Sequence, residues 1–187
     1  MAQHGQPIGG ALLGRDIHAR TRQWDDRLLR IVYQFPYRDL VVREAERHSM
    51  DPFMIAGLIR QESFFNPVAI SPVGAVGLMQ VMPATGAGLA RRVGISGFSA
   101  ASLRQPEVNV RLGTLFVADQ MNRWDGRLSD VFAAYNAGPN RVVRWRQFPE
   151  HRDDEIYIER IPLQETRDYV KRLMLNGEIY RRLYASD

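Results

Sequence analysis

Glu62 is the residue of this 187-residue chain whose type and position most favour chemistry. It follows Leu58 and Ile59 at helical spacing, so a helix over this stretch would place its carboxylate on the apolar face. An ionised carboxylate buried without a partner is unstable, and its pKa rises. We therefore expect Glu62 either to pair with a basic neighbour, Arg60 or Arg91, or to remain protonatable near neutral pH. A proton donor of that kind suits the cleavage of a glycosidic bond.

The helix that carries Glu62 has clear end signals. Asp51 is a favourable N-cap, and Pro52 suits the first helical position. The helix must end by Asn66, because Pro67 disfavours the helical conformation in the residue before it. Residues 68–77 then form a loop whose glycines allow positive φ angles and the close approach of a ligand.

The rest of the pattern is also helical, and strand signals are nearly absent. Residues 1–14 are rich in glycine and resemble a loose terminus, while residues 147–158 are polar and charged and predict a short extended piece or a lid-like loop. We expect one mainly α domain. Helices are predicted over residues 17–33 (with Trp24 facing inward), 37–48, 83–93, 106–124, 128–136 and 139–145, and after Pro162 to the end of the chain.

Composition excludes several classes of site. The absence of cysteine excludes disulfides and thiolate metal sites, and the four histidines lack ligand spacing, so we expect no metal. The formal net charge of +4 favours anionic surroundings. Aromatic residues do not interleave with the basic ones, which argues against a nucleic-acid partner. The sequence has neither the apolar run of a membrane span nor the pattern of a signal peptide, so we expect a cytoplasmic protein or a mature or excised chain.

Four separated motifs stand in one order along the chain: RQES at 60–63, GLMQVMP at 77–83, AYNAG at 134–138 and IPLQETRDYV at 161–170, with SPVGA at 71–75 between the first two. Together they resemble the catalytic domain of the soluble lytic transglycosylases, the goose-lysozyme-like enzymes that cut peptidoglycan. The resemblance implies a lysozyme-like (goose-type) helical domain with a substrate cleft over residues 37–187. Residues 1–36 would be an N-terminal extension, which looks like the junction to an upstream helical module.

The resemblance implies roles for seven residues. Glu62 matches the catalytic acid/base, and Tyr135 matches the tyrosine whose phenol approaches it. The other five have both a functional and a structural interpretation. Ser63 orients the acid or completes the helix end, Gln80 binds sugar or braces its loop, and Ser71 lines the cleft or stabilises a turn. Met82, like Met79, forms the floor of a saccharide subsite or fills the core, and Glu165, whose role Glu159 could exchange, binds substrate or forms a salt bridge.

The resemblance also implies a mechanism that needs one carboxylate. Glu62 protonates the glycosidic oxygen, and then takes the proton of the C6 hydroxyl of N-acetylmuramic acid as that oxygen attacks C1 of the same ring. The product is a 1,6-anhydro sugar, and no cofactor is implied. Two alternatives stay open. One is a hydrolytic muramidase, in which Glu165, Glu159 or Asp153 positions a water; the other is a non-catalytic peptidoglycan-binding module.

The implied partner is the glycan strand of peptidoglycan. This function places the protein in the periplasm or the cell envelope. Peripheral association with the envelope and the oligomeric state remain open.

Overall fold

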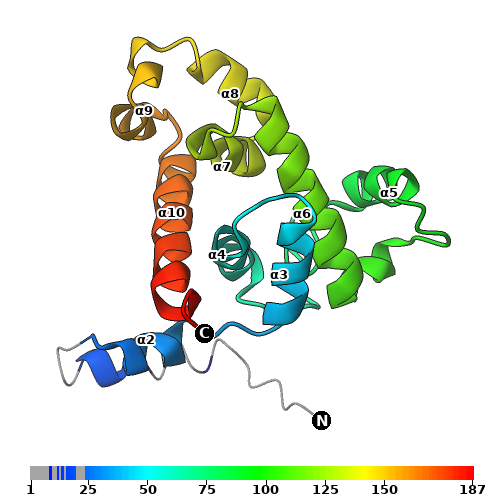
Figure 1. Cartoon of the computed structure of the whole chain (residues 1–187). Coiled ribbons are helices and arrows are strands. Elements are labelled where there is room, and N and C mark those ends of the chain that lie inside the picture. The colour runs from blue at the N-terminus through cyan, green and yellow to red at the C-terminus, as the bar shows by residue number, and fades with distance from the viewer. Residues whose placement is uncertain (1–8, 10–11, 13, 15, 20–23) are drawn as a thin grey trace.

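A computed structural model describes residues 9, 12, 14, 16–19 and 24–187 of the chain. The described residues are mostly helical, and two isolated antiparallel bridges, Ile70–Val76 and Val76–Val81, stand in place of a sheet (Figure 1). The predicted mainly α fold is therefore confirmed. The α-helices are α2 (Asp26–Val32), α3 (Arg38–Glu46), α4 (Pro52–Ser63), α5 (Pro83–Arg92), α6 (Pro106–Arg123), α7 (Leu128–Ala137), α8 (Pro139–Trp145), α9 (Asp154–Arg160) and α10 (Gln164–Tyr184), and the 3-10 helices are η1 (Ala100–Arg104) and η2 (Pro149–Arg152).

Helix α4 begins and ends as its sequence predicts. The carboxylate of Asp51 accepts a hydrogen bond from the backbone N–H of Phe53 at 2.9 Å, and Pro52 opens the helix. The helix ends at Ser63 because Phe64 and Phe65 take left-handed conformations, with φ angles of 50° and 59°. The predicted starts of α5, α6 and α8 at prolines are confirmed as well.

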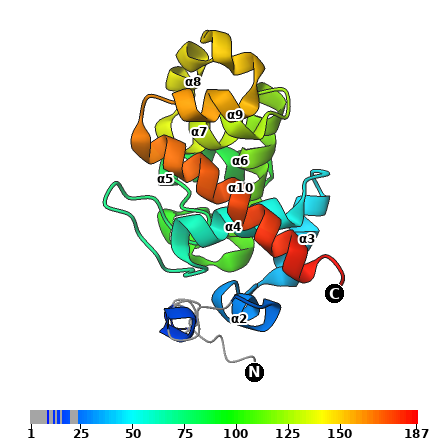
Figure 2. The same ribbon diagram turned by 90° about the vertical axis from the view of Figure 1, so that its left-hand side faces the viewer.

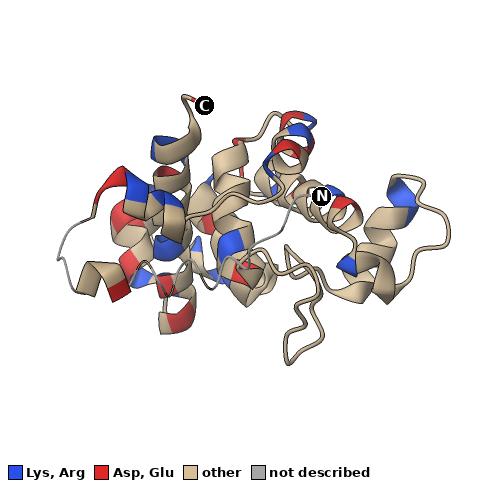
Figure 3. Cartoon of the chain, turned by 90° about the horizontal axis from the view of Figure 1, so that it is seen from below, with Lys and Arg blue, Asp and Glu red and all other residues tan. Residues whose placement is uncertain are grey.

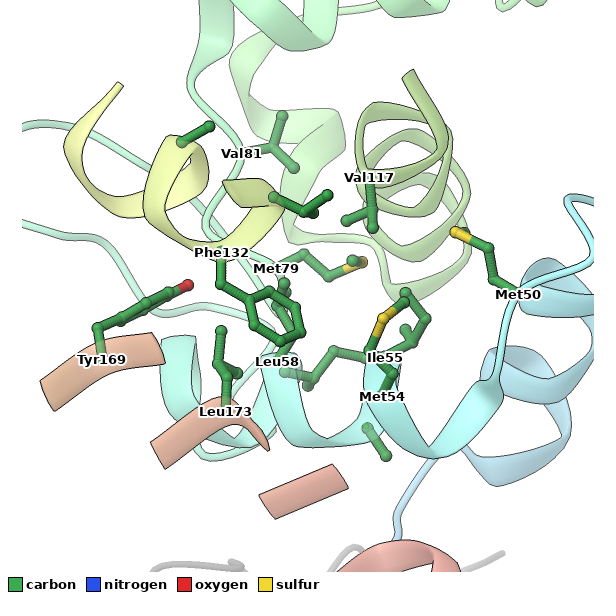
Figure 4. Close-up of a cluster of buried hydrophobic side chains, with 14 of the residues drawn as sticks. Met50, Met54, Ile55, Leu58, Met79, Val81, Val117, Phe132, Tyr169 and Leu173 are labelled. Atoms are coloured by element: carbon green, nitrogen blue, oxygen red, sulfur yellow. The ribbon is translucent and has the colours of Figure 1, made fainter. Parts of the chain in front are cut away.

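Helix α4 lies at the centre of the molecule and makes its most extensive contact with α10 (Figures 1 and 2). The two helices cross closely at Gly57, where an added Cβ would lie 2.9 Å from the backbone nitrogen of Gly177. The α4 residues Ile55 and Leu58 are fully buried and meet Phe132 of α7 and Leu173 of α10 (Figure 4). The helix that carries Glu62 is thus held on several sides.

Charged segments of both signs are distributed over the helices, whereas the loop between α4 and α5 carries none (Figure 3). Indeed, residues 63–90 contain no Asp, Glu, Lys or Arg. Within the described residues, no helix has the length and apolar character needed to cross a membrane.

The prediction of an irregular segment at residues 147–158 is wrong. These residues form η2 and most of α9, and Asp153 caps α9 by accepting hydrogen bonds from two amides of its first turn. The fully buried Asp130 of α7 holds His151 at 2.9 Å, and Tyr157 is also fully buried. Because Asp130 lies on another helix, the local pattern alone could not indicate this stabilisation.

The prediction of one helix over residues 17–33 is also wrong. Residues 16–19 are helical, but residues 24 and 25 are not, and Asp25 instead caps the separate helix α2 through a 2.8 Å hydrogen bond from Leu28. Trp24, expected to face inward, is 44% exposed and stacks on His18 with ring centroids 4.3 Å apart. The predicted loose terminus at residues 1–14 falls largely outside the described residues.

Candidate active site

Glu62 is the penultimate residue of α4 and is half-buried. Burial raises the pKa of its carboxyl group to about 7, although a hydrogen bond from Tyr169 opposes this rise. Neither basic candidate neutralises it. Arg60 donates instead to the carbonyl oxygen of Val32 at 2.7 Å, and in the described part of the chain Glu62 forms no ion pair with Arg91. The carboxyl group is therefore a proton donor available near neutral pH.

The phenol that contacts the Glu62 carboxylate comes from Tyr169 of α10. Tyr135 lies near enough for the charge of Glu62 to act on it, but its hydroxyl donates to the carbonyl oxygen of Met79 at 2.6 Å. Burial raises the pKa of both phenols well above the ordinary value, and the charge of Glu62 adds to both rises. Both tyrosines thus stay neutral hydrogen-bond donors beside the carboxylate, Tyr169 in direct contact and Tyr135 through the adjacent loop.

Ser63 links the end of α4 to this loop. Its hydroxyl is buried and lies 2.8 Å from the carbonyl oxygen of Leu78 and 3.2 Å from that of Ile59, one helical turn earlier. The contact with Ile59 is a local helix-end bond, whereas the contact with Leu78 connects two elements. Ser63 therefore acts on the position of the neighbouring Glu62 through the backbone and does not contact its carboxylate in this structure.

The loop beside Glu62 is a tight hairpin closed by reciprocal backbone hydrogen bonds between Val76 and Val81, at 3.0 and 3.1 Å. The buried side chain of Asn109 on α6 clamps it. Its amide nitrogen donates to the carbonyl oxygens of Val76 and Leu103 at 2.8 and 2.7 Å, and its oxygen accepts from the Met79 amide at 2.8 Å. Asn109 thus gives a partner to the Met79 amide and the Leu103 carbonyl oxygen, and adds a second hydrogen bond to the Val76 carbonyl oxygen, which Val81 already contacts.

Gln80 lies in this hairpin with a left-handed backbone, at a φ angle of 47°. The side-chain nitrogen donates to the carbonyl oxygens of Gly77 at 2.9 Å and Ala69 at 3.3 Å. The glutamine therefore braces its loop, and its role as a sugar contact remains a prediction. Both of the side-chain hydrogen bonds formed among the described residues use the amide nitrogen.

Ser71 and the two methionines occupy different environments. The Ser71 hydroxyl accepts a hydrogen bond from the Ala75 amide at 3.0 Å, so it stabilises the turn while keeping its own proton free to donate. Met79 is fully buried, which makes the structural interpretation correct for that residue. Met82 is 42% exposed and remains available to a ligand.

Glu165 is exposed in the first turn of α10. It lines a pocket of about 310 Å³ together with Asn136 and Arg141, among others. The alternative residue Glu159 forms an ion pair with Lys171 at 2.5 Å, and this contact lowers the pKa of its carboxyl group. Of the two acids, Glu165 is thus the one that lines a pocket.

Sequence reasoning missed two residues of the site. Tyr169 is given no role by the sequence analysis, although its place in the fourth motif is a usable signal. Asn109 gave no motif, but a polar amide between the apolar residues Val108 and Val110 of a predicted helix was a weak indication of a buried hydrogen-bonding role.

Comparison with known proteins bears directly on this site. Residues 39–158 match the family model described as the transglycosylase SLT domain. The chain is 37% identical over 152 residues to the soluble lytic murein transglycosylase of Escherichia coli K12, an alignment that covers 79% of this chain and 24% of that protein. It is also 36% identical over 117 residues to membrane-bound lytic murein transglycosylase C of Haemophilus ducreyi, covering 58% of this chain and 32% of that protein.

Solved structures of lytic transglycosylases share the fold of this chain. An inactive mutant of the lytic transglycosylase Slt from Pseudomonas aeruginosa superimposes with a TM-score of 0.81 at 35% identity, over 94% of this chain and 30% of that one. A complex of a 70-kDa soluble lytic transglycosylase with bulgecin A gives 0.81 at 32% identity, over 96% and 29%. These likenesses confirm the predicted fold class. The chain spans about a quarter of the length of the soluble curated relatives that it matches.

Proposed function

Because the chain belongs to the transglycosylase SLT domain family, we propose that it is a peptidoglycan lytic transglycosylase. It cleaves the β-1,4 bond between N-acetylmuramic acid and N-acetylglucosamine and leaves 1,6-anhydromuramic acid ends. The observation that carries the proposal is the half-buried carboxyl group of Glu62, whose pKa is raised to about 7 and which has a neutral phenol rather than a cation as its partner.

In the proposed reaction Glu62 is first an acid and then a base. Its proton passes to the glycosidic oxygen as the bond between C1 and that oxygen breaks, and the substrate's own N-acetyl group stabilises the positive charge at C1. The Glu62 carboxylate, which holds the hydrogen bond from Tyr169, then removes the proton of the C6 hydroxyl. The C6 oxygen bonds to C1 of the same ring, and Glu62 returns to its protonated state.

Two of the three carboxylates that could serve as the second acid of a hydrolase are engaged by other groups, which supports this one-acid route. A hydrolase needs a second carboxylate as a base or nucleophile. Glu159 is held by Lys171, and Asp153 accepts the amide hydrogens at the start of α9. The intramolecular C6 hydroxyl needs no second acid, because well-oriented intramolecular groups reach effective molarities of about 10⁵ M or more.

We assign substrate contacts to Gln80, Ser71, Met82 and Glu165. Gln80 keeps its amide oxygen, and Ser71 its hydroxyl proton, for polar groups of the sugar. Met82 offers an exposed apolar surface, and Glu165 lines its pocket. The loop between α4 and α5, which carries Ser71, Gln80 and Met82, has no charged residue and offers neutral hydrogen-bonding groups, which suit an N-acetylated glycan.

The proposed substrate places the protein in the periplasm or at the cell envelope, and glycan strands of peptidoglycan are its partner. The relatives include enzymes named soluble and others named membrane-bound, which supports action on the wall from either state. Nucleic acid is not a proposed partner.

The deciding experiment is mass spectrometry of the muropeptides released from purified peptidoglycan by the wild type and by Glu62→Gln. We expect products that end in 1,6-anhydromuramic acid, one water lighter than their reducing counterparts, from the wild type only. Reducing ends would instead establish a hydrolase with a second acid. Peptidoglycan binding without release of any product would establish a binding module.

A further inference from the structure

Arg60, two residues before Glu62, is a buried cation. It is 7% exposed, and in the described part of the chain no carboxylate forms an ion pair with it. Its guanidinium instead donates at 2.7 Å to the carbonyl oxygen of Val32, the last residue of α2. The last carbonyl groups of a helix lack partners within the helix and carry partial negative charge, so this contact satisfies both groups.

The guanidinium also lies between two aromatic rings. It is 4.0 Å from the ring centroid of Tyr33 and 5.0 Å from that of Phe64. A cation over an aromatic face is stabilised most where water is excluded. Arg60 therefore joins Tyr33, which follows α2, to Phe64, which follows α4.

The turn that Arg60 contacts is strained. Phe64 and Phe65 follow Ser63 with φ angles of 50° and 59°, a conformation that side-chain-bearing residues rarely adopt twice in succession. Such strain persists where surrounding contacts hold it. Phe65 is 2% exposed and packs near the ring of Phe35, with centroids 6.3 Å apart.

Helix α10 fixes the same part of the chain from its other side. The Tyr180 hydroxyl donates to the carbonyl oxygen of Gln34 and the Tyr184 hydroxyl to that of Tyr33, both at 2.9 Å. By contrast, the ion pair that joins α2 to the C-terminus, Arg30 with Asp187, is exposed and contributes little.

We propose that residues 32–35, here called the α2 exit segment, position Glu62 for catalysis, and that Arg60 is the residue through which they act. Arg60 and Tyr33 are positioning residues, because neither contacts the carboxylate. The inference rests on the proposed function of Glu62. The segment lies within the predicted N-terminal extension, so the catalytic unit would begin before α2 rather than at residue 37.

The test measures kcat and KM for release of anhydromuropeptides by five variants. Tyr33→Leu removes the ring that lies against the guanidinium, and Arg60→Met and Arg60→Lys remove the planar guanidinium itself. Each should lower kcat about tenfold or more with KM within twofold, because a planar guanidinium stacks on aromatic rings in a way that an ammonium group does not. Tyr33→Phe keeps the ring and should retain kcat within twofold. Arg182→Gln, which removes the exposed ion pair between α10 and Asp26 of α2, is the matched control and should behave like the wild type.

Each variant is assayed well below its unfolding midpoint, and Arg60→Lys, which keeps the buried charge, serves where Arg60→Met fails to fold. The double variant Tyr33→Leu/Arg60→Met should lose no more kcat than either single change, because both remove one contact. Additive losses, or kcat preserved in Arg60→Lys and Tyr33→Leu, would overturn the inference.

A second readout separates this inference from the proposed function. The titration of the ¹³C-labelled Glu62 carboxyl group, followed by NMR, should move toward lower pH in Tyr33→Leu, because a loosened turn lets water reach the carboxylate, and should stay unchanged in Tyr33→Phe. A wild type that releases no anhydro product would refute the function, while this titration would still decide the positioning role. An unchanged titration in Tyr33→Leu would refute that role.

Discussion

At the scale of single residues, the stability of the fold and the chemistry of Glu62 are linked through one proton. Burial raises the pKa of the folded state from the ordinary 4.5 to about 7. Between these pH values the folded chain holds a proton that the unfolded chain releases. The contribution of Glu62 to the free energy of unfolding is therefore fully present below pH 4.5 and is lost as the pH rises through 7.

Replacing Glu62 with Gln should remove this dependence. A rise of that size corresponds to about 3 kcal/mol, so Glu62→Gln should exceed the wild type in free energy of unfolding by up to about 3 kcal/mol at pH 8. At pH 4.5 the two proteins should differ much less, because both side chains are then neutral. Urea unfolding at the two pH values measures this, and an equal difference at both would contradict it.

The two tyrosines near Glu62 should have separable effects. The hydrogen bond from Tyr169 lowers the pKa of Glu62, so Tyr169→Phe should move the descending limb of kcat/KM from about pH 7 to higher pH and should also lower kcat. Tyr135→Phe should leave the limb in place and lower the free energy of unfolding by about 1–3 kcal/mol, because the Met79 carbonyl loses its donor. Identical pH profiles for the two variants would contradict these assignments.

At the scale of elements, the hairpin at residues 76–81 depends on close contact with α6. Gly77 has a φ angle of 82°, and an added Cβ would lie 2.2 Å from both the Asn109 side-chain nitrogen and the Leu103 carbonyl oxygen. The neighbouring turn contains Gly74 with a similar φ angle of 88° but nothing within 4 Å of an added Cβ. Comparing substitutions at the two glycines therefore distinguishes the cost of a steric clash from the cost of a positive φ angle.

Alanine substitution at these positions is a matched test. Gly74→Ala should cost about 1–2 kcal/mol of free energy of unfolding, the price of a left-handed alanine alone. Gly77→Ala should cost about 3 kcal/mol or more and reduce activity, because the hairpin must move away from Asn109. Thermal unfolding and turnover of both variants measure this, and similar losses for the two would show that the clamp is unimportant.

At the scale of the whole molecule, the N-terminal and C-terminal parts of the chain meet around Arg60. A chain that begins at residue 37, the predicted start of the catalytic domain, would lose the Val32 carbonyl oxygen that accepts a hydrogen bond from buried Arg60. It should lose about 1.5–3 kcal/mol in free energy of unfolding from this contact, as expected for a hydrogen bond to a charged group. A chain that begins at residue 24 keeps α2 with the Val32 acceptor and should be more stable than the chain that begins at residue 37; equal stability of the two truncated chains would favour the boundary at residue 37.

The helical class, most helix ends and the place of Glu62 at the apolar side of α4 could be predicted from the sequence alone. These features follow from N-caps, prolines and the spacing of apolar residues, which act within a few positions along the chain. The four motifs also identified the family. Such local signals do not depend on how the helices are arranged in space.

The packing of the helices determines three features that local patterns do not reveal: the tyrosine that contacts Glu62, the acceptor for Arg60 and the helical form of residues 147–158. Tyr169 lies 107 positions from Glu62 in the chain, and Asp130 lies 21 positions from His151. Each contact forms because buried polar groups require hydrogen-bond partners. The way the helices pack determines which partners lie within hydrogen-bond distance. That choice is a property of the assembled core, which no single segment contains.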